Sequence, residues 1–417
     1  MLLNKDYKFW FCTGSQDLYG EECLAKVAQH SKQIVDELNK TGVLPYEIVW
    51  KPTLITNELI RKTFNEANND ETCAGVITWM HTFSPAKSWI LGLQEYRKPL
   101  MHLHTQFNEE LPYDTIDMDF MNENQSAHGD REYGHIVTRM RIERKVVVGH
   151  WSDPVVQEKI ASWMRTAVGV IESSHIRVMR VADNMRNVAV TEGDKVEAQL
   201  KFGWEVDAYP VNEIAESVAA VSESDTNVLV DEYYEKYDIL LEGRDPEEFR
   251  RHVAVQAQIE LGFERFLDEK NYQAIVTHFG DLGGLKQLPG IAAQNLMGKG
   301  IGFGPEGDYK ISALSAVLMK MSEGKEGATG FIEDYTYDLT PGQELELASH
   351  MLEVPPAFAA TKPEIDVIPL GIGGKEDPAR LIFDGVTGDG IQVTMVDMGD
   401  HFRIICADIE LVKQPKP

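Results

Sequence analysis

Short apolar runs alternate with longer amphipathic segments through the first half of the chain. The runs at 7–14, 46–51, 73–80, 99–105 and 145–151 are rich in β-branched and aromatic residues, which predicts strands. The segment 23–40, between the first two runs, has the apolar spacing of a helix. Alternating strands and helices are typical of βα units, so we predict an α/β fold built on a parallel sheet.

Polar and aromatic residues follow several predicted strands where each strand ends. In open parallel sheets, ligands bind beyond the carboxyl ends of the strands. We therefore expect a binding rim on the first sheet, made of three tripeptides: Gly14, Ser15 and Gln16; His81, Thr82 and Phe83; His104, Thr105 and Gln106.

Three domains are predicted, over 1–175, 176–326 and 327–417. Ser152 or Asp153 can cap a helix that has Pro154 in its first turn, and this amphipathic helix closes the first domain. A second α/β region follows. From residue 327 onward, short strands and turns replace the α/β pattern, so the last domain is predicted to be mostly β.

Composition excludes several functional classes. The 417 residues carry a formal net charge of −27, which repels phosphate backbones and argues against a nucleic-acid partner. No apolar run approaches the roughly 18 residues needed to cross a bilayer, and the first residues lack a cleavable signal pattern. We expect a cytoplasmic protein without a membrane partner. Its four cysteines form no CxxC pair and are expected to be reduced: Cys12, Cys23, Cys73 and Cys406.

Two further kinds of site, a phosphate-binding loop and a histidine metal site, are considered and are not expected. The segments GDLGGLK and LGIGGKE do not match a phosphate-binding loop, and turns explain them more simply. His81, His102 and His104 are close in sequence, and His102 and His104 share one face of a predicted strand, which would let them bind one metal ion. The strands are predicted to be buried in the sheet. We expect hydrogen-bonded histidines there and no metal site.

Two glutamates and one histidine form the strongest chemical signal. They are Glu306 in GFGPEGDYK, Glu333 in GFIEDYTYD and His350 in ELASHMLEV. Two carboxylates and one imidazole suit a divalent cation such as Mn²⁺. Their spacing has no helical period, so only the fold can bring them together. Three unrelated surface or capping residues are the alternative interpretation.

Long phrases around these residues resemble the L-arabinose isomerases, and the resemblance runs through the whole chain. They include FWFCTGSQDLYG, WMHTFSPAKSWI, NENQSAHGDREYG, GPEGDYK, FIEDYTYD, SHMLEV and LGIGGKEDPARLIF. The resemblance implies two N-terminal α/β domains of the Rossmann or flavodoxin-like type, as in the fucose and arabinose isomerases, and a β-rich C-terminal domain. It also implies a homo-oligomer, most often a hexamer, without an organic cofactor.

The resemblance also implies roles for individual residues. Glu306, Glu333 and His350 would bind Mn²⁺, with Co²⁺ or Mg²⁺ as possible substitutes, and the two glutamates would act as acid and base. Gln125 and His128 would complete the pocket, with His128 reaching the active site of a neighbouring subunit. The implied sugar-binding residues are Gln16, Leu18, Tyr19, Phe83, Gln125, His128, Met185, Phe279 and Ile372.

The implied reaction converts L-arabinose to L-ribulose in arabinose catabolism, with D-galactose to D-tagatose as a side reaction. A cis-enediol route would use Glu306 and Glu333 for proton transfer. A metal-assisted hydride shift is the alternative, and the sequence does not decide between them. A second hypothesis is a non-catalytic sugar-binding protein on the same scaffold.

The sequence stops before a family segment that carries a further histidine ligand. His401 does not match that segment, so we do not assign it as a ligand. We expect a C-terminal domain that is incomplete relative to the family, and an enzyme that folds but is impaired by the missing ligand.

Overall fold

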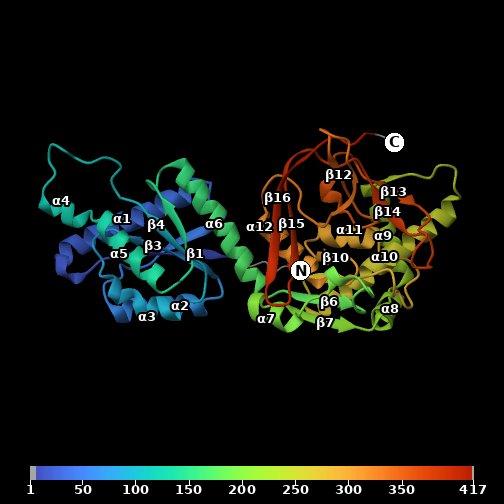
Figure 1. Cartoon of the computed structure of the whole chain (residues 1–417), viewed down its shortest axis with the longest axis horizontal. Helices are drawn as coiled ribbons and strands as arrows, with labels where there is room; N and C mark the ends of the chain where they lie inside the picture. The colour runs from blue at the N-terminus through green and yellow to red at the C-terminus, as the bar shows by residue number, and fades with distance from the viewer. Residues whose placement is uncertain (1–5, 416–417) are drawn as a thin grey trace. The chain divides into compact units, whose positions relative to one another are not determined.

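The computed structural model describes residues 6–415, and these form two compact units (Figure 1). The N-terminal unit extends to Ile171, and the C-terminal unit begins at Glu172. The C-terminal unit contains both the second α/β region and the β-rich region.

A five-stranded parallel sheet forms the centre of the N-terminal unit. Its strands are β1 (Lys8–Gly14), β2 (Glu47–Trp50), β3 (Cys73–Met80), β4 (Leu100–His104) and β5 (Lys145–Val148), in the spatial order β2-β1-β3-β4-β5. This is the flavodoxin-like order, in which ligands bind at the switch point between β1 and β3. The predicted α/β class is confirmed.

Six α-helices connect these strands or follow the last of them. They are α1 (Gly20–Lys40), α2 (Asn57–Asn69), α3 (Ile90–Glu95), α4 (Met118–Glu123), α5 (Ser126–Arg139) and α6 (Pro154–Ser173). The predicted start of α6 is confirmed, because the Asp153 carboxylate accepts a hydrogen bond from the Val155 amide at 2.8 Å. The apolar face of α6 packs on the sheet core through Val156, Ile160, Met164 and Val168.

The α/β part of the C-terminal unit has a four-stranded parallel sheet in the order β10-β9-β6-β7. Its strands are β6 (Arg177–Val181), β7 (Glu205–Tyr209), β9 (Ala274–Val276) and β10 (Gly302–Gly304). The helices are α7 (Lys195–Phe202), α8 (Val211–Ala219), α9 (Glu223–Lys236), α10 (Pro246–Lys270), α11 (Ile291–Gly298) and α12 (Tyr309–Met321).

The rest of the chain is mostly β, as predicted. β11 (Glu333–Asp338) pairs with β12 (Leu345–Ser349), and β15 (Gly388–Asp397) pairs with β16 (Phe402–Leu411), both antiparallel. β13 (Glu364–Val367) pairs with β14 (Ala379–Ile382) and also with the short β8 (Asp238–Ile239). Because β8 belongs to the α/β part, this small sheet joins the two regions of the C-terminal unit.

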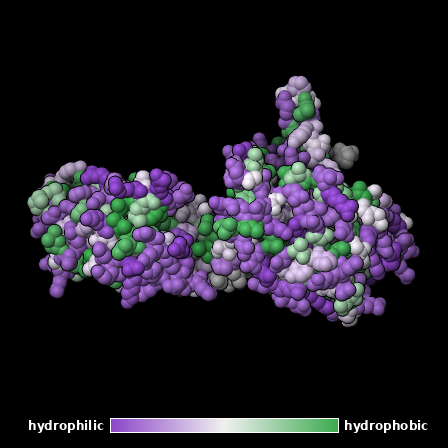
Figure 2. Space-filling model, turned by 60° about the horizontal axis from the view of Figure 1, so that its bottom comes forward, coloured by the Kyte–Doolittle hydropathy of each residue, from purple (hydrophilic) through white to green (hydrophobic). Residues whose placement is uncertain are grey.

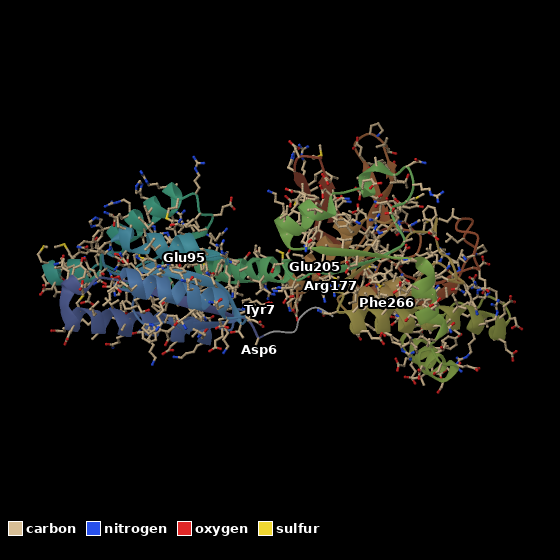
Figure 3. All side chains as sticks on the ribbon, turned by 90° about the horizontal axis from the view of Figure 1, so that it is seen from below. Asp6, Tyr7, Glu95, Arg177, Glu205 and Phe266 are labelled. Atoms are coloured by element: carbon tan, nitrogen blue, oxygen red, sulfur yellow. The ribbon has the colours of Figure 1, made fainter. Side chains whose placement is uncertain are left out.

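The surface in Figure 2 is mostly hydrophilic, with hydrophobic residues in small groups. Charged pairs also link neighbouring strands. Arg177 of β6 and Glu205 of β7 lie beside each other in Figure 3, and the Arg177 Nε donates to the Glu205 Oε2 at 3.0 Å. Among the described residues, no helix is both long and apolar enough to cross a membrane.

Candidate active site

Three predicted site residues follow the carboxyl ends of three adjacent strands of the C-terminal unit. Met185 follows β6, Phe279 follows β9 and Glu306 follows β10. The Met185 amide donates to the Glu306 carbonyl at 2.9 Å, which holds two of these loops together. This is the edge at which parallel sheets place their ligands.

The backbone around Glu306 is tightly constrained. Glu306 has a φ of 56°, a left-handed conformation that is uncommon for residues other than glycine. Gly307 also has a positive φ, and a Cβ there would lie 2.5 Å from the Asn184 Cα. A Cβ on Gly304 would lie 2.2 Å from the Asp308 carbonyl oxygen. The glycines of the GFGPEG segment therefore let the chain turn sharply and present Glu306 at the strand end.

Glu333 and His350 meet at one end of the β11–β12 hairpin. Glu333 opens β11 opposite Ser349, and His350 directly follows Ser349. The His350 Nε2 lies 3.5 Å from the Glu333 Oε2. The His350 side chain is only 4% exposed, whereas that of Glu333 is 45% exposed, so the imidazole is fixed and the carboxylate remains accessible.

Glu353 is a buried partner of His350 that the sequence reasoning missed. Its Oε2 lies 2.5 Å from the His350 Nδ1 and also accepts a hydrogen bond from the Leu352 amide at 3.0 Å. With Nδ1 held in this way, Nε2 is the ring nitrogen that faces Glu333. The spacing in SHMLEV was a possible signal, because a carboxylate three residues after a ligand histidine can reach its second nitrogen.

Electrostatics also connect Glu306 with the other two residues. Burial raises the pKa of Glu333, and the Glu306 charge raises it further while His350 opposes both. Burial lowers the pKa of His350, but Glu353, Glu333 and Glu306 together raise it above its ordinary value. The charge of Glu306 therefore acts on both Glu333 and His350, whereas Glu333 and His350 themselves lie 3.5 Å apart.

This donor set fits a divalent cation. Two carboxylates and one imidazole are donors that suit Mn²⁺, and an orienting hydrogen bond on the second ring nitrogen is usual for a histidine ligand. The accessible Glu333 carboxylate beside the His350 imidazole also suits acid–base chemistry.

The other predicted residue of this unit, Ile372, is half-buried in the loop between β13 and β14. This loop runs close to Phe279, because a Cβ on Gly373 would lie 3.3 Å from the Phe279 carbonyl oxygen. His401 lies instead in the turn between β15 and β16, where its Nδ1 contacts the Asp400 carboxylate at 2.6 Å.

The predicted residues of the N-terminal unit gather near the switch point between β1 and β3. The Tyr19 hydroxyl donates to the Gln125 Oε1 at 3.3 Å, and the rings of Phe83 and His128 are 4.5 Å apart. Gln16 directly precedes the 3-10 turn Asp17–Tyr19, which includes the exposed Leu18. We call Gln16, Leu18, Tyr19, Phe83, Gln125 and His128 the polar rim.

Two of the three clustered histidines have the hydrogen-bond partners that we expected. The His102 Nε2 lies 2.8 Å from the Asp130 Oδ1, and the His81 Nε2 lies 2.8 Å from the His30 Nδ1. His104 is farther from its carboxylate neighbour, with its Nε2 3.8 Å from the Asp130 Oδ2. The prediction that His102 is hydrogen-bonded is confirmed.

Three family models match successive parts of the chain. The L-arabinose isomerase N-terminal domain matches residues 3–175, the central domain matches 177–324 and the C-terminal domain matches 328–417.

Curated relatives match nearly the whole chain. L-arabinose isomerase of Geobacillus thermodenitrificans is 56% identical over 99% of this chain and 83% of its own length. The L-arabinose isomerases of Anoxybacillus flavithermus and Clostridium beijerinckii are 57% and 54% identical over 99% of this chain, and over 82% and 83% of their own lengths.

The family models and the relatives define the chain as an intramolecular oxidoreductase, an aldose–ketose isomerase. The alternative of a non-catalytic sugar-binding protein is therefore not supported. More specifically, the chain belongs to the L-arabinose isomerase family.

Proposed function

We propose that this enzyme converts L-arabinose to L-ribulose, and D-galactose to D-tagatose as a side reaction, at Glu306, Glu333 and His350. The observation that carries the proposal is that His350, directly after β12, places its Nε2 3.5 Å from the Glu333 carboxylate at the start of β11, with the charge of Glu306 acting on both. D-Galactose differs from L-arabinose by a distal CH₂OH group, which a pocket rejects only weakly.

Glu306, Glu333 and His350 would hold one Mn²⁺, or Co²⁺ or Mg²⁺ in its place. When bound, the cation would polarise the sugar carbonyl and acidify the neighbouring hydroxyl. Glu353 would keep the His350 ring in its binding orientation, because it engages Nδ1 and is itself held by the Leu352 amide.

The two glutamates would move the protons. In the cis-enediol route, one carboxylate removes the proton from C2 while O1 gains a proton. Returning a proton to C1 and removing the O2 proton then gives the ketose. We propose that Glu306 and Glu333 share these proton transfers, one as the base at C2 and the other as the acid.

The polar side chains of the polar rim would bind the hydroxyl groups of the sugar, and its two apolar side chains, Leu18 and Phe83, would pack against the sugar. Its contacts, including Tyr19 with Gln125 and Phe83 with His128, belong to the N-terminal unit. We propose that the enzyme is a homo-oligomer, most simply a hexamer, in which the His128 side of one subunit completes the active site of its neighbour.

The test is ketose formation from both sugars, measured after chelation and again after Mn²⁺ is restored. The proposal predicts that turnover is lost on chelation and returns with Mn²⁺, with L-arabinose the better substrate. Turnover that is unchanged in metal-free protein would contradict the assigned cation, and turnover of neither sugar under any metal would contradict the assigned substrates.

A further inference from the structure

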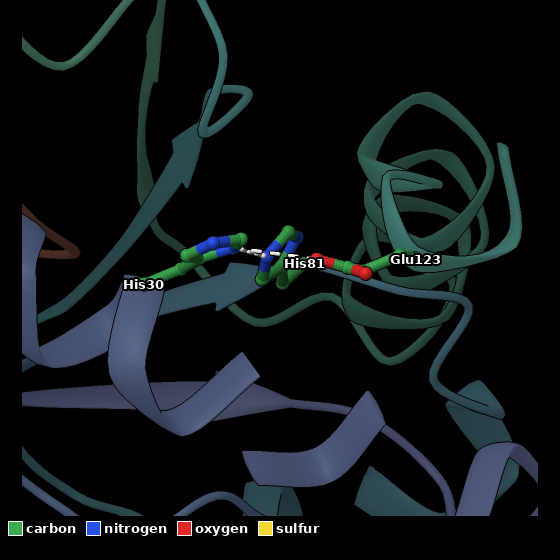
Figure 4. Close-up of side chains that lie close together, drawn as sticks. All are labelled: His30, His81 and Glu123. Atoms are coloured by element: carbon green, nitrogen blue, oxygen red, sulfur yellow. Dashed lines mark hydrogen bonds and ion pairs between the residues drawn. The ribbon is translucent and has the colours of Figure 1, made fainter. Parts of the chain in front are cut away.

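A second histidine–carboxylate group lies in the N-terminal unit, at the carboxyl end of its sheet. His81 directly follows β3, His30 lies on α1 and Glu123 is the last residue of α4. Figure 4 shows the three side chains pointing toward one another from these separate elements. Segments that are distant in sequence therefore bring potential metal ligands together.

The distances between the donor atoms are short. The His30 Nδ1 lies 2.8 Å from the His81 Nε2 and 3.7 Å from the Glu123 Oε1. All three potential ligand atoms lie within 4.8 Å of one another. Each residue thus offers one donor atom to the same small space.

Aromatic stacking holds both imidazole rings in place. The His30 ring stacks on Phe107 with centroids 3.6 Å apart and planes 6° apart. The His81 ring stacks on Trp79 at 4.5 Å and 16°. Both rings therefore present a nitrogen to the same small space in a fixed orientation.

We propose that His30, His81 and Glu123 form a second metal site, which takes Zn²⁺ or a similar borderline transition metal. Two imidazoles and one carboxylate, with a fourth position open to water, are a usual donor set for Zn²⁺. The donor balance is the reverse of that at Glu306, Glu333 and His350, where carboxylates outnumber imidazoles. The two sites therefore differ in the metal that each prefers.

Binding requires a small rearrangement of the group. Zn–N and Zn–O bonds of about 2.0–2.1 Å place tetrahedral donor atoms about 3.3 Å apart. The two histidine nitrogens must therefore give up their hydrogen bond and move slightly apart, while the Glu123 oxygen moves closer. Glu123 can do this because its side chain is 16% exposed and its other neighbour is Lys26, at 3.5 Å.

A metal ion at this site would restrict the motion of the segment that carries Gln125 of the polar rim. Glu123 precedes Gln125 by two residues, and Gln125 accepts the hydrogen bond from Tyr19. A shared ion would join the end of α4 to α1 and to the end of β3. The inferred site is thus a structural clamp on the segment that carries Gln125, and it does not depend on the function proposed above.

The test is Zn²⁺ binding to the full chain after chelation, followed by competition with a chromophoric chelator. Co²⁺ absorption is the second readout, because tetrahedral Co²⁺ has a distinctive spectrum. A Glu306→Gln, Glu333→Gln background removes the other site, so that only the second site is measured. His30→Asn and Glu123→Gln are the informative changes, because both side chains are partly exposed and their loss leaves the core intact.

In that background we expect one Zn²⁺ per chain. His30→Asn and Glu123→Gln should each weaken Zn²⁺ binding at least tenfold and abolish the tetrahedral Co²⁺ spectrum. His135→Asn, on the exposed face of α5, is the matched control and should change neither readout. Zn²⁺ binding that is absent in the background, or that survives His30→Asn and Glu123→Gln unchanged, would overturn the second site. Either result would leave the isomerase assignment untouched.

Discussion

The two histidine–carboxylate groups differ most in what holds the second nitrogen of each histidine ring. In the C-terminal unit, the His350 Nδ1 is bound by the buried Glu353, so Nε2 is directed at Glu333. In the N-terminal unit, the His81 Nδ1 is buried and has no hydrogen-bond partner among residues 6–415. At the first site, the His350 Nε2 is therefore already oriented toward a ligand. At the second site, the His30 Nδ1 and the His81 Nε2 are hydrogen-bonded to each other and must separate before a metal ion binds.

This difference shows that a set of ligand residues does not by itself define a strong metal site. A second hydrogen bond fixes the ring and raises its basicity, and losing such a partner typically costs 10- to 100-fold in metal affinity. We therefore expect tighter binding at Glu306, Glu333 and His350 than at His30, His81 and Glu123.

The largest effect is expected from the catalytic carboxylates. Glu306→Gln and Glu333→Gln should each lower kcat by about 10²- to 10⁴-fold, because each removes an acid–base group as well as a negative donor. Ketose formation from L-arabinose measures this loss. Glu326→Gln, an exposed change in the segment before β11, should keep full activity. Near-normal turnover in either site variant would assign the chemistry to other residues.

A smaller effect is expected from the residue that orients His350. Glu353→Ala should weaken Mn²⁺ binding about 10- to 100-fold, because Nδ1 loses its partner and the ring loses its fixed orientation. Glu353→Gln should lose less, since its amide oxygen can still accept from Nδ1. Calorimetry with Mn²⁺ distinguishes these variants without an activity assay. His30→Asn should leave Mn²⁺ binding unchanged. If His30→Asn weakened Mn²⁺ binding as much as Glu353→Ala does, the proposed difference between the two sites would be wrong.

The smallest effect is expected in the polar rim. Tyr19→Phe removes one hydrogen bond to Gln125. The net contribution of one hydrogen bond is about 0.5–1.5 kcal/mol, which corresponds to a rise in KM of up to about tenfold. The value of kcat should hardly change, because Tyr19 is not assigned to proton transfer. Steady-state kinetics with L-arabinose provide the measurement, and Tyr113→Phe is the exposed control. A loss confined to kcat would show that Tyr19 acts on the chemistry itself.

Much of this fold could be predicted because its strands and helices are indicated by residues that are close together in the sequence. The strands of the first sheet follow from apolar runs, and α6 follows from the Asp153 cap and its apolar spacing. The pairing of β8 with β13 could not be predicted in this way, since two residues of strand carry almost no signal and their partner is more than a hundred residues away.

The same limit applies to the sites. Glu306, Glu333 and His350 were predicted through the phrases around them, and the structure places the Glu333 and His350 side chains 3.5 Å apart. Glu353 was missed because its role depends on burial and on a contact to a ring nitrogen. His30 and Glu123 were missed because nothing in the sequence links a helix residue at 30 to a strand end at 81 or a helix end at 123.

Mn²⁺ binding to chelated protein, followed by electron paramagnetic resonance, tests the central claim most directly. We predict one bound Mn²⁺ per chain, which is lost in the Glu306→Gln, Glu333→Gln double variant and retained in His30→Asn. Tight Mn²⁺ binding that survives the double variant, or disappears in His30→Asn, would contradict the assignment of the catalytic cation to Glu306, Glu333 and His350.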